Sequence, residues 1–149
     1  MITNQNPVIH ADFSDALKAT PHLQDGKFGK IDSTGKIALA TNADEAVGII
    51  LNPDSHTVAV AGNATGADLC LRSFGGIIEA QAGTLSAGIG VGQMLSLGSD
   101  GRITDAEGTP VAVAAEAVTE TTAGQMVRVV LLPFSAPAAE DEGGSSDGE

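Results

Sequence analysis

Short apolar runs, each bounded by turn-forming residues, recur between residues 24 and 134 and constrain the fold more than any other feature of this chain. The runs are rich in Val, Ile or Leu, and Gly, Asn, Asp and Ser fall between them at short intervals, a pattern typical of an all-β domain. The predicted strands are 28–32, 37–40, 46–51, 57–60, 68–74, 76–80, 94–97, 111–117 and 125–132. We therefore expect a small β-barrel or β-sandwich.

The predicted hairpin turns in segments 31–37 and 97–103 resemble each other. Gly35 and Gly101 each stand where such a turn needs a positive φ, which glycine adopts without steric cost. Both turns belong to an internal repeat whose segments align in the same order: 26–37 with 92–103, 46–51 with 110–115, and 66–71 with 124–129. Because repeats this short cannot each bury a face alone, we expect the two halves to close one common core within a single domain.

Composition divides the chain into three zones. Residues 1–23 are polar and predict an extended N-terminal arm with one short helical turn at 15–19. Residues 24–134 contain all the predicted strands and form the β-domain. Residues 135–149 contain five acidic residues, no basic residue and no large apolar residue. Such a tail cannot bury enough surface to offset its chain entropy, so it is predicted to be disordered.

The net charge of −12 argues against partners that are themselves anionic. Nucleic acids and anionic membranes bind clusters of Lys and Arg, whereas the seven basic residues here are scattered singly. No apolar stretch approaches the roughly 20 residues that a transmembrane helix needs, and the first residues do not resemble a signal peptide. We expect a soluble protein, made without export, that binds neither nucleic acid nor membrane. The lone Cys70 is expected to be a small buried apolar residue.

Segments that resemble catalytic or binding motifs each lack an essential feature. The turn that begins at Asp32 has one residue too many before Gly35 for an aspartic-protease signature. The glycine-rich segment 88–92 lacks both the spacing and the following helix of a dinucleotide-binding fingerprint. Lys36 stands beside a hairpin, as the modified lysine of a lipoyl or biotinyl carrier does, but Arg102 takes its place in the second half.

Imidazole and carboxylate groups gather in the predicted arm, at His10, Asp12, Asp15 and His22. Such groups can hold a metal ion or act as bases, but these four follow no known ligand spacing and lie on a segment expected to be flexible. We interpret the histidines as solvated or partner-contacting. The sequence therefore predicts no metal, no cofactor and no catalytic residue, and the protein is not expected to be an enzyme.

The arm also carries apolar side chains on an otherwise polar segment, at Pro7, Val8, Ile9 and Phe13. A segment of this kind can become ordered against a partner, and these four residues are the predicted partner contacts. The many Ala, Gly, Thr and Val residues elsewhere lose little side-chain entropy when they pack against other subunits. The sequence thus favours a structural or binding role.

The order of several strand and turn segments resembles that of tailed-bacteriophage capsid decoration proteins, also called cement proteins. A strand with a glutamate followed by small residues and Gly leads to an alanine-glycine step and a hairpin, and then to an alternating Val and Ala strand and a terminal apolar strand. The segments that carry the resemblance are 48–51, 76–83, 85–96, 100–103, 111–117 and 127–132. Together they place the resemblance over residues 24–133.

The resemblance implies a β-barrel-like domain that assembles, commonly as a homotrimer, on the outer surface of the phage head. There it would bridge subunits of the major capsid protein and resist the pressure of the packaged DNA. It implies a structural virion protein made in the host cytoplasm. The alternative is a phage spike or attachment β-module that binds a host-surface ligand, and an enzyme that uses the histidines of the arm comes third.

Overall fold

Almost all regular structure in the computed structural model of this chain is β, which confirms the predicted all-β class. The structure describes residues 7–51, 53, 66–72 and 77–133. Its strands are β1 Val8–Asp12, β2 Phe28–Ile31, β3 Ile37–Leu39, β4 Gly48–Leu51, β5 Gly66–Leu71, β6 Ile77–Ala82, β7 Met94–Leu97, β8 Ile103–Thr104, β9 Ala112–Ala114 and β10 Gln125–Leu131. Helix α1 at Asp15–Lys18 and the 3-10 turn η1 at Pro21–Gln24 join β1 to β2. The predicted strand at 57–60 and the predicted disordered tail at 135–149 lie outside the described residues.

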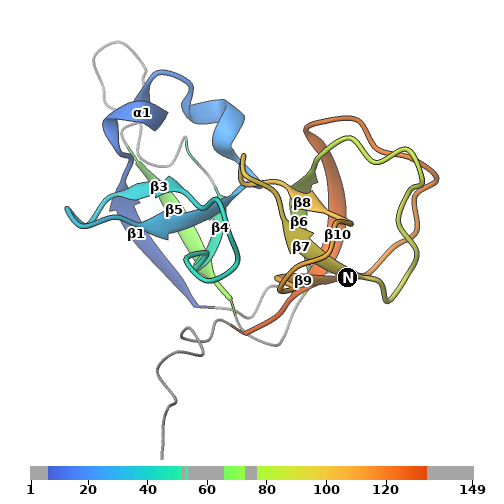
Figure 1. Cartoon of the computed structure of the whole chain (residues 1–149). Helices are drawn as coiled ribbons and strands as arrows, with labels where there is room; N and C mark the ends of the chain where they lie inside the picture. The colour runs from blue at the N-terminus through green and yellow to red at the C-terminus, as the bar shows by residue number, and fades with distance from the viewer. Residues whose placement is uncertain (1–6, 52, 54–65, 73–76, 134–149) are drawn as a thin grey trace, which may run out of the picture.

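The ten described strands form two halves of five strands each (Figure 1). The first half is a sheet in the order β1-β5-β4-β2-β3, and the second is a closed barrel in the order β10-β6-β8-β7-β9. The barrel closes through a parallel pair between Ala82 and Ile103. A parallel bridge between Phe13 and Ile37 joins the ends of β1 and β3 in the first half. Both halves therefore follow one topology, in which β1 to β5 correspond in chain order to β6 to β10.

The two halves also share their strand register, which extends the predicted internal repeat to the level of single residue pairs. Equivalent cross-strand pairs are Phe28–Ile49, Ile49–Cys70 and Cys70–Val8 in the first half, and Met94–Val113, Val113–Val130 and Val130–Ile77 in the second. Hydrogen bonds outside the ladders recur as well. Ser14 N donates to Ile37 O at 2.8 Å as Gly83 N does to Ile103 O at 3.0 Å.

One segment of the sequence alignment is shifted by two residues. We expected 66–71 to match 124–129, but the pairing of β5 and β10 with their neighbours matches Gly66–Leu71 with residues 126–131. The aligned glycines have different roles. Gly124 has φ +93° in the turn before β10, whereas Gly66 lies in a strand where an added Cβ would stand 2.3 Å from Ala11 O. The match of two glycines was therefore coincidental, because sheet pairing sets the register.

Each half closes around its own interior. The interior of the first half is filled by Phe13, Leu17, Ile37, Ile50, Ala67 and Leu69. The equivalent strand positions of the second half are also buried: Ala82, Ile103, Ala114, Val127 and Val129. The cluster of the second half includes Phe28, Ile49 and Cys70 from the outer face of the first half. The chain thus has two interiors, joined through one outer face, rather than the single common core expected from the repeat length.

The predicted N-terminal arm is wrong for residues 8–13. Residues Val8–Asp12 form β1 and pair with β5 along their whole length, from Val8 opposite Cys70 to Asp12 opposite Gly66. The following Phe13 is completely buried in the first interior. The polar composition that suggested an arm reflects a strand whose side chains are mostly exposed. The predicted helical turn at 15–19 is present as α1.

Candidate interaction surfaces

The predicted partner contacts on β1 separate into exposed and buried residues. Pro7, Val8 and Ile9 are exposed, with Val8 at 42% and Ile9 at 39%. These two are among the few large apolar side chains of the described residues that face solvent. Phe13 is 0% exposed, so the prediction that it contacts a partner is wrong: it fills the core that closes β1 onto β3. The surface that remains is the start of β1, where Val8 and Ile9 expose apolar side chains on opposite faces of the strand.

The four candidate metal ligands of the N-terminal segment do not come together. His10 pairs with Asp68 on the neighbouring strand β5, and His10 Nδ1 lies 2.5 Å from Asp68 Oδ1. Asp15 forms an exposed ion pair of 3.6 Å with Lys18. Within the described part of the chain, no group of three or more His, Cys, Asp or Glu residues is placed to hold a metal ion. His10 and Asp68 instead link β1 to β5 at the edge of the first half.

Asp32 is a turn-forming residue. Its Oδ1 accepts hydrogen bonds from Thr34 N at 2.8 Å, Thr34 Oγ1 at 2.6 Å and Lys36 N at 3.0 Å. The bond from the Thr34 hydroxyl, followed by those from the backbone, holds the pKa of the Asp32 carboxyl below its usual value. Gly35 has the predicted positive φ of 83°, and Gly101 matches it with 82°. The carboxylate stabilises the β2–β3 hairpin.

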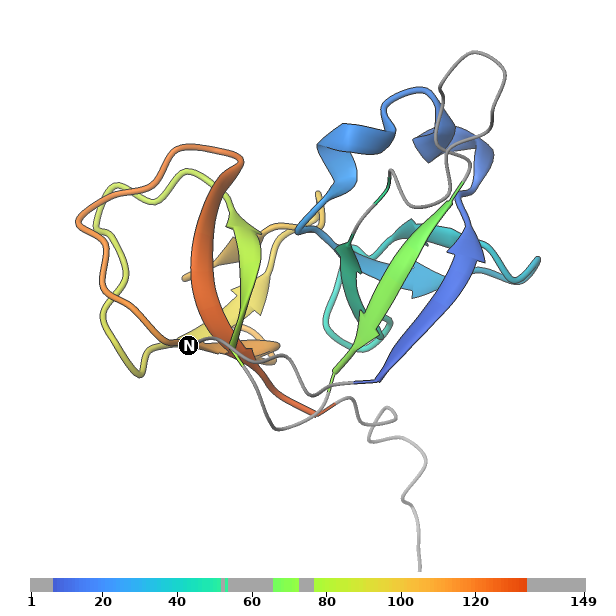
Figure 2. The ribbon, with the colours of Figure 1, turned by 180° about the vertical axis from the view of Figure 1, so that it is seen from behind.

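The glycine-rich segment 88–92 forms one arm of a paired loop that extends from the barrel (Figures 1 and 2). Isolated bridges join Leu85 to Thr121 and Ile89 to Val118, so the loop before β7 lies against the loop before β10. An added Cβ at Gly88 would stand 2.3 Å from Val118 O, and φ there is +76°. Gly88 therefore allows the two loops to pack closely backbone against backbone. This packing accounts for the glycine that resembled part of a phosphate-binding motif.

The tip of the β7–β8 hairpin contacts the first half at the start of β2. Phe28 N donates to Gly101 O at 2.8 Å, and an added Cβ at Gly101 would lie 3.3 Å from Leu39 Cδ2. Gln81 adds a second connection, because its backbone N donates to Gly26 O at 2.8 Å and its Nε2 donates to Asp25 O at 2.7 Å. These bonds hold the two halves against each other.

A buried arginine connects the first half to the end of β10. Arg72 Nε donates to Leu132 O at 2.9 Å, and its Nη1 donates to Ala43 O at 3.0 Å and Ala46 O at 2.9 Å. Burial lowers the pKa of this guanidinium. At the β7–β8 hairpin, burial and then the charge of Arg102 lower the pKa of Lys27, while Asp100 partly opposes the shift. The contact between the halves therefore contains buried positive charge in an acidic chain.

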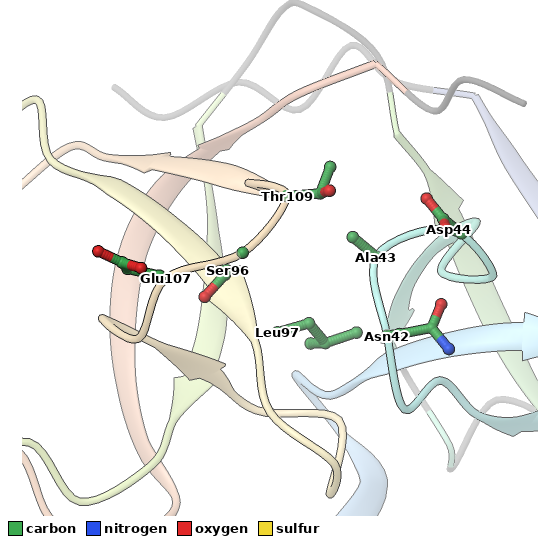
Figure 3. A pocket seen from close by; sticks show the side chains of 8 residues that line it. Asn42, Ala43, Asp44, Ser96, Leu97, Glu107 and Thr109 are labelled. Atoms are coloured by element: carbon green, nitrogen blue, oxygen red, sulfur yellow. The ribbon is translucent and has the colours of Figure 1, made fainter. Parts of the chain in front are cut away.

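A small cavity lies where the two halves meet (Figure 3). Its lining comes from the turn after β3 and from β7 and the loop after β8: Asn42, Ala43, Asp44, Ser96, Leu97, Glu107, Gly108 and Thr109. Its volume of 160 Å³ is below the roughly 300 Å³ at which clefts begin to hold small-molecule ligands. It marks the boundary of the halves, with Leu97 placed beside Asn42 and Ala43.

A row of apolar side chains on the outside of the second half was not found from the sequence. It consists of the directly paired residues Met94, Val113, Val130 and Ile77, hereafter the outer row of the second half. Met94 is 60% exposed, and the other three are half-buried. The alignment of 26–37 with 92–103 contained the necessary signal, because it places Met94 at the position of Phe28. The sequence does not say which of the two is covered.

No family model matches the chain, and no curated protein matches it either. Within the described residues, the helices are too short to cross a membrane.

Proposed function

We propose that this chain is a structural virion protein that binds the outer surface of a phage head and stabilises the lattice of the major capsid protein, as a homotrimer. The observation that carries the proposal is the exposure of two apolar side chains, Val8 and Ile9, on β1 at the edge of the first sheet. The resemblance in segment order to capsid decoration proteins suggests the partner of these side chains. The role is adhesive, and Val8 and Ile9 are its contact with the capsid.

Exposed apolar side chains on a paired strand suit this role. The backbone of β1 is already fixed by its pairing with β5, so little ordering entropy opposes binding. Two large side chains give a weak contact by themselves. Three copies held about one axis bind together, and such multivalency raises the overall affinity by about 10²–10⁴ without any additional contact.

Co-sedimentation with phage heads tests the proposal. The purified protein is mixed with expanded heads that lack it, and with unexpanded procapsids as the particle control. We expect saturable binding to expanded heads and increased resistance of those heads to heat. The variant Val8→Asp/Ile9→Asp should bind at least about tenfold more weakly. Point substitutions are needed here because deletion of residues 1–12 would remove β1 from its sheet.

Leu23→Asp is the matched control, because Leu23 is 62% exposed and lies on η1 rather than on β1. It should bind heads as the unmodified protein does. Failure of the unmodified protein to bind either particle would refute the capsid role and favour the attachment module. Equal binding by the Val8/Ile9 variant would show that another surface contacts the capsid.

A further inference from the structure

The two halves contribute different surfaces to the contact between them. The first half supplies three of the four directly paired residues of its outer row, Phe28, Ile49 and Cys70, all 0% exposed, whereas the fourth, Val8, is 42% exposed. The second half supplies the β7–β8 hairpin, with Leu97 at the boundary and the hairpin tip at residues 98–102. The contact is therefore heterologous: an outer row meets a hairpin.

Because the halves share topology and register, each half also has an equivalent of the surface that the other half contributes. These two equivalent surfaces take no part in the contact within the chain. The second half has an outer row equivalent to that of the first, and Met94 in it is 60% exposed where Phe28 is buried. The first half has a hairpin equivalent to 98–102, at residues 32–36, preceded by Ile31 in the position of Leu97. Ile31 is 38% exposed.

These two unused surfaces cannot meet within one chain as it is folded. The hairpin 32–36, between β2 and β3, projects away from the second half in both views of the molecule (Figures 1 and 2). The outer row of the second half is apolar at all four positions. In the equivalent row of the first half, Phe28, Ile49 and Cys70 are buried, and the hairpin of the second half meets that row at Phe28. This internal contact indicates what would cover the outer row of the second half.

We propose that copies of this chain associate head to tail, with the outer row of the second half of one copy packed against Ile31 and the hairpin 32–36 of the next. The association repeats between chains the contact that each chain makes once internally. Heterologous contacts give a closed ring where the rotation between copies closes, and the proposed homotrimer is such a ring. The inference thus deepens the self-association part of the proposed function by naming its surfaces, and it does not require a capsid.

Sedimentation analysis of the free protein at concentrations up to about 100 μM tests the inference. The unmodified protein should form a discrete oligomer. Met94→Glu places a charge in the outer row and Ile31→Glu places one beside the hairpin, and each should weaken association at least about tenfold. Leu23→Glu is the control with matched exposure, 62% against 60% for Met94, and should leave association unchanged. Circular dichroism and thermal melting confirm that each variant is folded.

Mixing the two interface variants distinguishes head-to-tail association from a symmetric contact. Met94→Glu retains an intact hairpin, and Ile31→Glu retains an intact outer row, so the mixture should give one-to-one dimers although each variant alone is monomeric. A mixture that stays monomeric would overturn the head-to-tail arrangement. A monomeric unmodified protein, or a Met94→Glu variant that associates normally, would overturn the inference altogether. Since no capsid is present, these failures are distinct from a failure to bind heads.

Discussion

Phe28 and Met94 occupy the same position in two halves of one repeated fold, yet Phe28 is completely buried and Met94 is 60% exposed. Phe28 pairs with Ile49 as Met94 pairs with Val113, so strand geometry does not account for the difference. The difference lies in what covers each residue. The hairpin of the second half meets Phe28, whose backbone N donates to Gly101 O at 2.8 Å, and the equivalent hairpin of the first half points away from the second half.

This asymmetry predicts unequal costs for truncating the two side chains. Phe28→Ala leaves a cavity at the contact between the halves and should lower the free energy of unfolding by about 3–5 kcal/mol. Met94→Ala removes an exposed side chain and should change it by less than about 0.5 kcal/mol in dilute protein. Urea denaturation of both variants measures the difference. Equal costs would mean that the two positions have similar environments.

The buried arginine predicts a second loss of stability. Arg72→Met removes a donor from the carbonyls of Ala43, Ala46 and Leu132. Ala43 O keeps its bond from Ala46 N, but loss of the other charged bonds at a buried site is costly. We expect the free energy of unfolding to fall by about 3 kcal/mol. Arg72→Lys keeps the charge but cannot reach all three oxygens, so it should recover only part of the loss. Full recovery by lysine would assign the effect to charge alone.

Two nearby glycines in the paired loops should differ in how much an alanine substitution lowers stability. An added Cβ at Gly88 would meet the carbonyl oxygens of Val118 and Thr119 at 2.3 and 2.5 Å, and φ is +76°. Gly88→Ala should therefore destabilise the protein by more than about 2 kcal/mol. At Gly90 the nearest atom is Gln93 Oε1 at 4.0 Å, so Gly90→Ala should change stability by less than about 0.5 kcal/mol. Thermal melting of both variants checks the contrast.

Two turn carboxylates predict how stability responds to acid. Hydrogen bonds from Thr34 and Lys36 lower the pKa of Asp32, and those from Thr41, with Lys30 nearby, lower the pKa of Glu45. Because the folded-state pKa lies below the unfolded value, the stabilisation is complete above about pH 4 and is lost as the pH falls through the folded-state pKa. Asp32→Asn and Glu45→Gln should each reduce the acid dependence of the melting temperature. An unchanged slope would contradict this assignment.

The acidity of the chain predicts the salt dependence of association. Each copy carries a net charge of −12, so copies repel one another at long range, whereas the proposed contact is apolar. Added salt screens the repulsion and should strengthen association between about 0.05 and 0.5 M NaCl. Sedimentation at several salt concentrations measures this response. Dissociation by salt would instead indicate a contact held by opposite charges.

The apolar runs and turn glycines were enough to predict the eight strands that correspond to β2–β7, β9 and β10, apart from differences at their ends. Strand β1 was missed because its side chains are mostly exposed, so that Val8–Asp12 lacks the apolar pattern of a buried strand. The two-residue strand β8 is too short to produce a pattern. The internal repeat was visible, but the two-residue shift of β10 depends on pairing between strands that are distant in sequence.

The surfaces were less predictable than the strands. Val8 and Ile9, predicted to contact a partner, are exposed, but Phe13 was not distinguishable from them in a polar segment. The covered state of Phe28 and the exposed state of Met94 arise from how two similar halves pack, which no local pattern encodes. Comparison of equivalent positions after the fold is known reveals the difference at once.

The exposure of Met94 as a function of protein concentration tests the central claim most directly. The rate at which hydrogen peroxide converts Met94 to its sulfoxide can be measured by peptide mass spectrometry, with Met126, which packs against Gly26 in the contact between the halves, as the internal reference. Burial of the outer row in a head-to-tail oligomer predicts fast oxidation of Met94 in dilute protein and marked protection in concentrated protein, with Met126 unchanged. Equal rates at both concentrations would contradict the account, because the outer row would then remain uncovered.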